Sequence, residues 1–347
     1  MRISSNKLFL CAAISAFAIL YFGPARFSQP APQRQQATRE DFERLMKELS
    51  NWGRWGKDDQ MGAVNLITAA KRKEALRLVQ DGVSVSLARN AETEQAPDNP
   101  QPIVRGAAGG GRGNRGAPAA TPPPDVSAVV DTFFIAYHGY AHTHMDSLAH
   151  FFYKGQMYNG YSRDEFTDER GAAKNGILNW KNGILTRGVL MDIPRLKGVE
   201  YLEPGTPIYP EDLDAWEKRA HLKVRPGDVV LIRTGRWARR AAKGPWPASD
   251  GFAGLYMTAA KWLHSRDAAI LGSDAAEDVL PSGVPGISQP IHELVLVAMG
   301  MPIFDNCDLE EVSKEAQKHN RWEFLITAAP AAVPNATGSV LNPIATF

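Results

Sequence analysis

The chain has 347 residues, 44% of them hydrophobic, which is enough to bury a substantial core. Its 39 basic and 38 acidic residues leave a formal net charge of +1, so no broad basic field is available to bind nucleic acid. Tail and low-complexity sequence fill much of the N-terminal third, and we therefore expect one domain of about 220 to 280 residues.

The N-terminus has the pattern of an export signal, because Arg2 and Lys7 precede an apolar run at 8–22. The run is long for a signal peptide and short for a membrane span. Residues 1–25 are therefore predicted to be a signal peptide for export to the periplasm, with an uncleaved N-terminal membrane anchor as the alternative. A membrane is a partner only in that second case. Residues 26–37 are rich in Pro, Gln and Ala and predict a disordered linker.

The folded domain is expected to span residues 38–347. It begins with a helix, because Thr38 and Asp41 form a variant of the capping box and apolar residues then recur at helical spacing. The loop that follows contains Trp55, a candidate substrate-binding residue that core packing would explain equally well. Residues 95–125 are rich in Gly and Pro and predict a flexible surface insertion, with a lid beside the histidine segment as an open alternative.

The remaining elements mix strands and helices without an internal repeat, as in an α/β domain. The sequence contains no phosphate-binding loop or dinucleotide fingerprint, and the lack of a G-x-S-x-G elbow argues against a serine hydrolase. The predicted strands are 83–87, 132–137, 188–193, 229–234, 268–272, 302–304 and 322–328, of which 188–193, 229–234 and 268–272 are expected to lie in the core. The predicted helices are 68–80, 211–221, 258–265, 290–299 and 309–319.

The chemistry concentrates in one stretch, residues 136–161, which contains four of the eight histidines and an aspartate between the last two. Histidine and carboxylate groups are the ligands that zinc and manganese prefer. Alternate residues of an extended strand share a face, so the sequence predicts a divalent metal site there. The strand-face ligands would be His142, His144 and Asp146.

The third near ligand is either His138 or His142. A straight strand would separate His138 from His144 by about 20 Å, which favours His142, whereas a bend at Gly139 would reverse the choice. His150 lies beyond the end of the strand. That position suits a general base acting on a metal-activated water.

Two further segments carry candidate substrate contacts. Residues 273–278 hold three carboxylates after a predicted strand, a position that substrate sites favour, and Asp274 is the candidate contact. A solvated acidic loop is an equally common explanation. Arg233 or Arg236 would be able to reach a substrate carboxylate, although the run that contains them is mostly a core strand. Cys307 is expected to be a buried small hydrophobe.

The segment THMDSLAH at 143–150 resembles the core of the metal-dependent cyclase and kynurenine formamidase-like hydrolase family, whose pattern is roughly H-x-G-T-H-x-D-x-P-x-H. His144, Asp146 and His150 match its second histidine, its aspartate and its last histidine. Tyr140 stands where the first histidine would be, and with His138 it is a candidate substrate-binding residue. Later landmarks such as GDVVLIRTG, ILGSD and GSVLNPIATF extend the resemblance to the C-terminus.

The resemblance implies two more metal ligands. His292 matches the distal histidine of the family's formamidases, and Asp305 stands where their glutamate would be. Because Asp305 is one methylene shorter, the number of metal ions stays open. The implied fold is a single α/β domain with a mixed sheet curved towards a barrel, of the swivelling β/β/α kind.

The implied activity is hydrolysis of an amide, lactam or ester bond in a small metabolite, often aromatic or cyclic. His150 would be the general base, a role suited to an unperturbed histidine pKa of about 6.5. Two alternatives remain, namely cyclisation or dehydration of a metabolite at the same metal, and an exported binding protein without turnover. The expected partners are a small-molecule substrate and further copies of the chain in a homo-oligomer.

Overall fold

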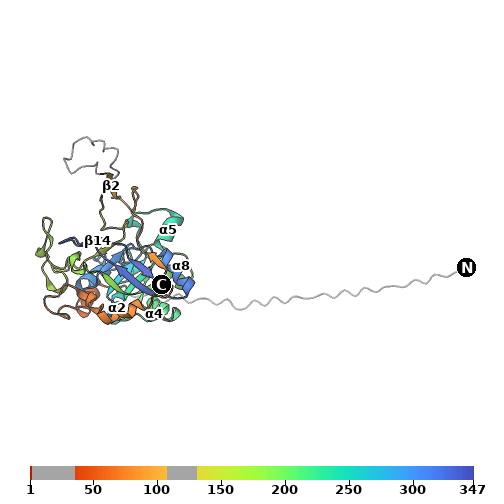
Figure 1. The fold of residues 1–347 in the computed structure, drawn as a ribbon, viewed down its shortest axis with the longest axis horizontal. Helices are drawn as coiled ribbons and strands as arrows, with labels where there is room; N and C mark the ends of the chain where they lie inside the picture. Colours follow the sequence, from red (N-terminus) through yellow and green to blue (C-terminus); the bar gives the residue numbers. More distant parts are fainter. Residues whose placement is uncertain (2–35, 108–130) are drawn as a thin grey trace, which may run out of the picture. The chain divides into compact units, whose positions relative to one another are not determined.

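The computed structural model describes Met1, residues 36–107 and residues 131–347, and Gln36–Phe347 form one compact unit (Figure 1). The predicted signal peptide, most of the predicted linker and positions 108–125 of the predicted insertion lie outside the described residues. Within the described part of the chain, no helix is long and apolar enough to cross a membrane.

A nine-stranded mixed sheet runs through this unit in the order β1-β15-β13-β7-β9-β11-β12-β4-β14. Its centre, β7-β9-β11-β12, is parallel, and antiparallel strands flank it on both sides. The predicted α/β fold with a mixed, barrel-like curved sheet is confirmed. The strands are β1 (Ser84–Ser86), β4 (His144–Asp146), β7 (Ile184–Asp192), β9 (Val229–Arg233), β11 (Ile270–Ser273), β12 (Ile303–Asp305), β13 (Glu323–Ala328), β14 (Gly338–Val340) and β15 (Ile344–Thr346).

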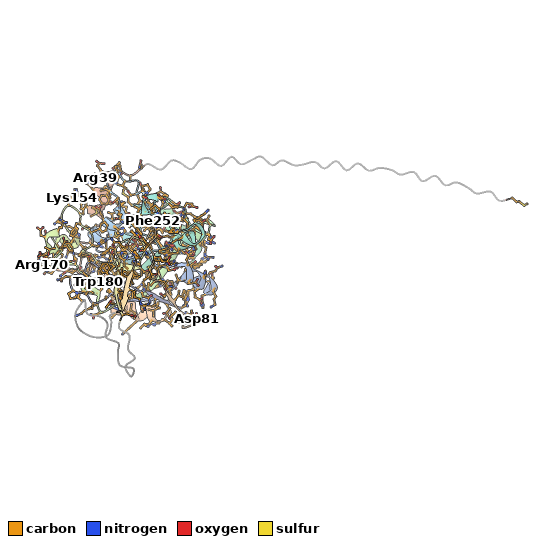
Figure 2. The ribbon with its side chains drawn as sticks, turned by 90° about the horizontal axis from the view of Figure 1, so that it is seen from above. Arg39, Asp81, Lys154, Arg170, Trp180 and Phe252 are labelled. Carbon is orange, nitrogen blue, oxygen red and sulfur yellow. The ribbon has the colours of Figure 1, made fainter. Side chains whose placement is uncertain are left out.

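The central strands are buried because they are continuous apolar runs, as strands covered on both faces usually are. Every residue of β9 and β11 is buried, and α2 and α4 pack against β7. Figure 2 shows the side chains that fill the unit, including the buried Trp180 and Phe252, with Arg39, Asp81, Lys154 and Arg170 towards its edge.

Most helices begin close to the predicted positions. The capping box of α1 is present, with the Asp41 amide donating to Thr38 Oγ1 over 3.1 Å. The predicted helix at 68–80 ends early, at Leu76, whereas α3 and α5 were not predicted. The α-helices are α1 (Arg39–Glu48), α2 (Ala69–Leu76), α3 (Ile193–Lys197), α4 (Pro210–Arg219), α5 (Arg236–Lys243), α6 (Ala259–Ser265), α7 (Pro290–His292) and α8 (Glu310–His319).

The predicted helix at 290–299 is not regular. Its first turn is α7, and a π-helical segment, η6 (Glu293–Ala298), continues it. Such π turns occur frequently at functional sites. The 3₁₀ turns are η1 (Gly62–Leu66), η2 (Tyr158–Gly160), η3 (Arg163–Glu165), η4 (Ile177–Trp180) and η5 (Ala248–Asp250).

The predicted apolar strand at 132–137 is present in shorter form, but it does not join the core sheet. Among the described strands, β3 (Asp131–Phe134) pairs only with β2 (Val104–Ala107), and this two-stranded ribbon leaves Phe133 and Phe134 67% and 70% exposed. Apolar composition alone cannot tell such a ribbon from a core strand. The other short pairs are β5 (Phe166–Thr167) with β6 (Gly171–Ala172), and β8 (Pro207–Ile208) with β10 (Gly254–Leu255).

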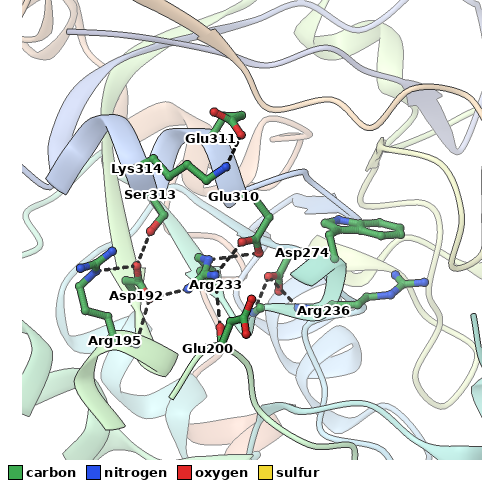
Figure 3. Close-up of polar contacts among 12 residues, drawn as sticks. Asp192, Arg195, Glu200, Arg233, Arg236, Asp274, Glu310, Glu311, Ser313 and Lys314 are labelled. Atoms are coloured by element: carbon green, nitrogen blue, oxygen red, sulfur yellow. Dashed lines mark hydrogen bonds and ion pairs between the residues drawn. The ribbon is translucent and has the colours of Figure 1, made fainter. Parts of the chain in front are cut away.

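Arg233 at the end of β9 is a structural residue. Its guanidinium donates to Asp192 Oδ1 over 2.9 Å and to Glu310 Oε2 over 2.7 Å, which ties β7 and β9 to α8 (Figure 3). Ser313 Oγ donates to the same Asp192 carboxylate over 2.5 Å. With its donors used in this buried network, Arg233 does not reach a substrate.

The loop between α1 and η1 supports the helix that carries His292. Asn51 Nδ2 donates to the Met299 carbonyl over 2.9 Å, and Trp52 Nε1 donates to the Val297 carbonyl over 2.7 Å. Gly62 lies at φ +58°, and a Cβ added there would lie 1.9 Å from the Gly300 carbonyl oxygen. Only glycine allows this close approach.

We therefore predict that Gly62→Ala lowers the free energy of unfolding by about 3 kcal/mol, because a left-handed conformation and a backbone clash act together. Gly53→Ala is the matched control, since Gly53 also has a positive φ of +75° but a Cβ added there would meet nothing within 4 Å. It should cost only about 1 kcal/mol. Urea denaturation measures both, and equal losses would contradict the close packing at Gly62.

Candidate metal centre

The candidate centre is built on β4 and its neighbour β12. In the antiparallel register His144 lies opposite Asp305, and Asp146 projects from the same face of β4 two residues along. Met145, between them, points into the core and is fully buried. His144 Nε2 lies 3.3 Å from Asp146 Oδ1 and 3.4 Å from Asp305 Oδ2. The predicted shared face of His144 and Asp146 is therefore present.

Two histidines are held through Nδ1 so that Nε2 faces the carboxylates. His144 Nδ1 donates to the His142 carbonyl over 2.9 Å. His292 Nδ1 lies 2.7 Å from Asp278 Oδ2, and its Nε2 lies 3.6 Å from Asp305 Oδ2. Histidines that bind metals are commonly oriented in this way, because a hydrogen bond at one nitrogen fixes the tautomer that leaves the other free.

His138 completes the cluster. Its Nδ1 lies 3.0 Å from Asp146 Oδ1, and its Nε2 lies 3.2 Å from Thr337 Oγ1. Two candidate ligand groups result, with Asp146 common to both, and the ligand atoms of each group lie within 4.8 Å of one another. The groups are His138, His144 and Asp146, and Asp146, His292 and Asp305.

Of the two candidates for the third near ligand, His138 belongs to a candidate ligand group and His142 does not. His142 is buried outside both ligand groups, and His138 takes its place. The prediction assumed a straight strand, but β4 begins only at His144 and Gly139 has a φ of +139°. The chain turns at Gly139 and brings His138 back to the cluster. This is the geometry of the alternative prediction, in which a bend at Gly139 makes His138 the third near ligand.

The donor set fits a divalent cation. Asp146, Glu277 and Asp305 are carboxylates that are 0%, 1% and 4% exposed. Both oxygens of Asp146 and of Glu277, together with Asp305 Oδ1 and His138 Nδ1, make no well-aligned hydrogen bond to the described residues, although His138 Nδ1 and Asp146 Oδ1 are only 3.0 Å apart. Buried polar groups are normally paired, so unpartnered carboxylate oxygens beside imidazole nitrogens are the donors expected for a divalent metal ion.

The charges of the cluster shift its pKa values strongly. Burial lowers the pKa of His144, but the charges of Asp146 and Asp305 outweigh burial and raise it to about 9. Burial likewise opposes the charge of His292, yet its bonds to Asp278 and Asp305 raise its pKa well above the usual value. Burial and the charge of Asp305 raise the pKa of Glu277. The carboxylates thus attract positive charge to this point.

A cavity of about 450 Å³ opens onto the cluster. His150 lies on its wall, with Nε2 3.6 Å from Asp146 Oδ2 and its ring stacked on His138 at 3.9 Å. Tyr140 also lines the cavity, with its ring stacked on Phe252 at a centroid distance of 4.9 Å. The lining residues are Gly139, Tyr140, His144, His150, Phe151, Phe152, Ala276, Gln289, His292 and Asp305.

Two predicted substrate contacts lie elsewhere. Trp55 packs against the main core and under the Arg54 guanidinium, and it does not line the cavity. The Asp274 carboxylate is fully buried and accepts hydrogen bonds from the Thr234 and Gly235 amides over 2.9 and 2.8 Å, next to the start of α5 (Figure 3). Neither residue lines the cavity, so the structure gives these two predicted substrate contacts no support.

Glu277 and Asp278 lie next to the candidate ligands, although the sequence predicts only Asp274 of this acidic run as a contact. The alternative of a solvated acidic loop is wrong, because all three carboxylates of the run are buried. Glu277 Oε2 lies 3.8 Å from His292 Nε2, and Asp278 orients the same ring. The clustering of three carboxylates after a strand was the signal that pointed to them.

Residues 70–277 match the family model described as "Putative cyclase". The chain belongs to the cyclase family. A protein whose crystal structure is described as that of a novel cyclase has 32% sequence identity to this chain. The two structures superpose with a TM-score of 0.75 over 86% of this chain and 100% of that one.

The cyclase-family fold is also that of isatin hydrolases. An isatin hydrolase bound to the product analogue thioisatinate is 16% identical, with a TM-score of 0.50 over 80% of this chain and 98% of that one. Isatin hydrolase A from Labrenzia aggregata, bound to benzyl benzoate, is 19% identical with a TM-score of 0.50 over 76% and 93%. A search of the curated proteins finds no match.

We predict that Asp278→Asn weakens zinc or manganese binding by about 10- to 100-fold, because the amide no longer enforces a donating Nδ1 on His292. Asp192→Asn is the control, since Asp192 is equally buried but belongs to the Arg233 network. It should lower the melting temperature and leave metal affinity unchanged. Calorimetric titration of the metal-free proteins decides, and equal affinity of Asp278→Asn and wild type would contradict this orienting role.

Proposed function

We propose that the protein is a metal-dependent hydrolase that cleaves an amide, lactam or ester bond in a small aromatic or cyclic compound. One observation carries the proposal. Beside a cavity, two Nδ1-anchored histidines and buried carboxylates form two candidate ligand groups that share Asp146, with a further histidine on the cavity wall. Metal-assisted hydrolysis needs this combination of ligands, general base and space for a substrate.

The proposed ligands lie in the turn before β4, on β4, on β12 and on α7, and they would hold a zinc or manganese ion. A divalent ion held there lowers the pKa of water and polarises a scissile carbonyl. The protein's part is to fix the donors, because every proposed ligand except His138 is fully or almost fully buried and held by the sheet or by a second hydrogen bond. These ligands are His138, His144, Asp146, His292 and Asp305.

His150 is the proposed general base. Burial lowers the pKa of its imidazole to about 4, although Asp146 opposes the shift, so the ring is neutral at pH 7. This pKa lies below the unperturbed value of about 6.5 from which the role was predicted, so the case for His150 rests on its position. It lies outside both ligand groups while lining the cavity. In the proposed reaction His150 takes the proton of the attacking water and returns it to the leaving group.

The cavity supports an aromatic substrate. Phe151 lies between His150 and His292 with ring centroids 5.0 Å from each, and Tyr140 and Phe152 add further aromatic surface. Flat rings stack well on such walls. Isatin is a bicyclic aromatic lactam, and the shared fold of isatin hydrolases makes it the first compound to test.

We predict that the purified protein hydrolyses at least one member of a panel of isatin, N-formyl anilines, lactams and lactones. His150→Ala should keep the metal and lose about a hundred-fold or more in kcat, because a positioned acid–base group is removed. His264→Ala is the control, since His264 lies on α6 outside the cavity, and it should retain both metal and turnover. Metal content and initial rates are measured on the same preparations.

The outcomes separate the candidate roles. Unchanged kcat in His150→Ala would remove it from the mechanism, and loss of metal would make it a ligand. Binding of panel compounds without turnover would indicate a binding protein, and dehydration products would indicate the cyclase or dehydratase alternative. Both outcomes contradict the proposed hydrolase.

We also propose that the protein acts after export, on the strength of Arg2, Lys7 and the apolar run at 8–22. Fractionation of cells that express the full chain should place it in the periplasm or at the membrane. A version that starts at Gln29 should stay in the cytoplasm. Recovery of both forms from the soluble cytoplasm would contradict export.

A further inference from the structure

The amide side chain of Asn306 forms hydrogen bonds with the segment between His138 and His144. Asn306, which follows the proposed ligand Asp305, donates through Nδ2 to the carbonyls of Gly139 over 2.7 Å and of His142 over 3.3 Å. Its own backbone carbonyl accepts a hydrogen bond from Thr143 Oγ1 over 2.8 Å. Three contacts from one residue therefore close the turn at 139–143.

Arg236 completes this brace from the first residue of α5. Its guanidinium is 2% exposed, and Nη1 donates to Asn306 Oδ1 over 2.6 Å while Nη2 donates to the Tyr140 carbonyl. A carboxylate oxygen of Asp98 lies farther from Nη2, at 3.9 Å. A buried cation that directs its donors at neutral oxygens of a turn serves that turn rather than an ion pair.

The brace is also continuous with the site. The His142 carbonyl that Asn306 contacts is the one that accepts the hydrogen bond from His144 Nδ1. The Gly139 and Tyr140 carbonyls directly follow His138, the ligand candidate that the turn returns to Asp146. These contacts oppose an extended path of the chain, in which His138 would lie about 20 Å from His144.

We propose that Asn306 and Arg236 are positioning residues that fix the 139–143 turn and so make His138 a metal ligand in place of the residue at position 140. This inference rests on the proposed metal site and is independent of the substrate. The left-handed backbone of Asn306, at φ +53°, suits its task because asparagine tolerates this conformation and offers an amide to the turn.

The test is a double-mutant cycle on metal affinity, measured by titrating zinc or manganese into the metal-free full chain. Asn306→Ala should weaken binding at least tenfold, the usual scale for residues that orient ligands. In a His138→Ala background the same change should cost less than about threefold, because the ligand that it positions is already absent. If Asn306→Ala folds poorly, Arg236→Lys takes its place in the cycle. Lysine keeps the charge but loses the forked guanidinium, so Arg236→Lys should weaken metal binding to a similar extent.

Asn159→Ala is the matched control. Asn159 also has a positive φ, of 62°, and its Nδ2 donates to the carbonyls of Gly56, Lys57 and Asp59 over 3.0, 3.1 and 3.0 Å. It should lower the melting temperature without changing metal affinity. The proposal is overturned if Asn306→Ala binds metal like wild type, or if its loss is equally large without His138. A wild-type chain that binds no metal would overturn the inference and the metal site together.

Discussion

One buried carboxylate, Asp146, is the point on which the rest of the site depends. It is fully buried in the sheet, and three histidines surround it, with ring nitrogens of His138, His144 and His150 at 3.0, 3.3 and 3.6 Å. Burying a carboxylate without a charge partner costs on the order of several kcal/mol, and these ring nitrogens are the groups that can offset that cost. The neighbouring strands β12 and β14 pair with β4 on both sides and fix the Asp146 backbone, so its side chain cannot turn towards solvent.

The other parts of the fold can be understood as supports for groups that face this carboxylate. β12 places Asp305 opposite His144, and the loop after β11 supplies Glu277 together with Asp278, which orients His292. The backbone of α7 is held in turn by the same Asp278, which accepts the Ile291 amide over 2.7 Å. Sheet, loop and helix thus converge on one point, and the aromatic cavity gives a small molecule access to it.

Local pattern predicted the parts of the structure whose causes are local. The α1 capping box, the buried parallel strands and the shared face of His144 and Asp146 follow from cap chemistry and from strand periodicity. The position of His138 in the cluster does not follow from local pattern, because Asn306 and Arg236 lie far along the chain from the turn that they hold. Glu277 and Asp278 look like a surface loop in sequence, since burial depends on tertiary packing. His292 was singled out only through the family resemblance.

The most direct test of this account is the metal dependence of turnover. The purified full chain is dialysed against a chelator, assayed with the best substrate of the isatin, formanilide, lactam and lactone panel, and then titrated with manganese or zinc. The account predicts that turnover disappears with the metal and returns to a plateau at about one ion per chain. Full turnover in protein shown to be metal-free would contradict it.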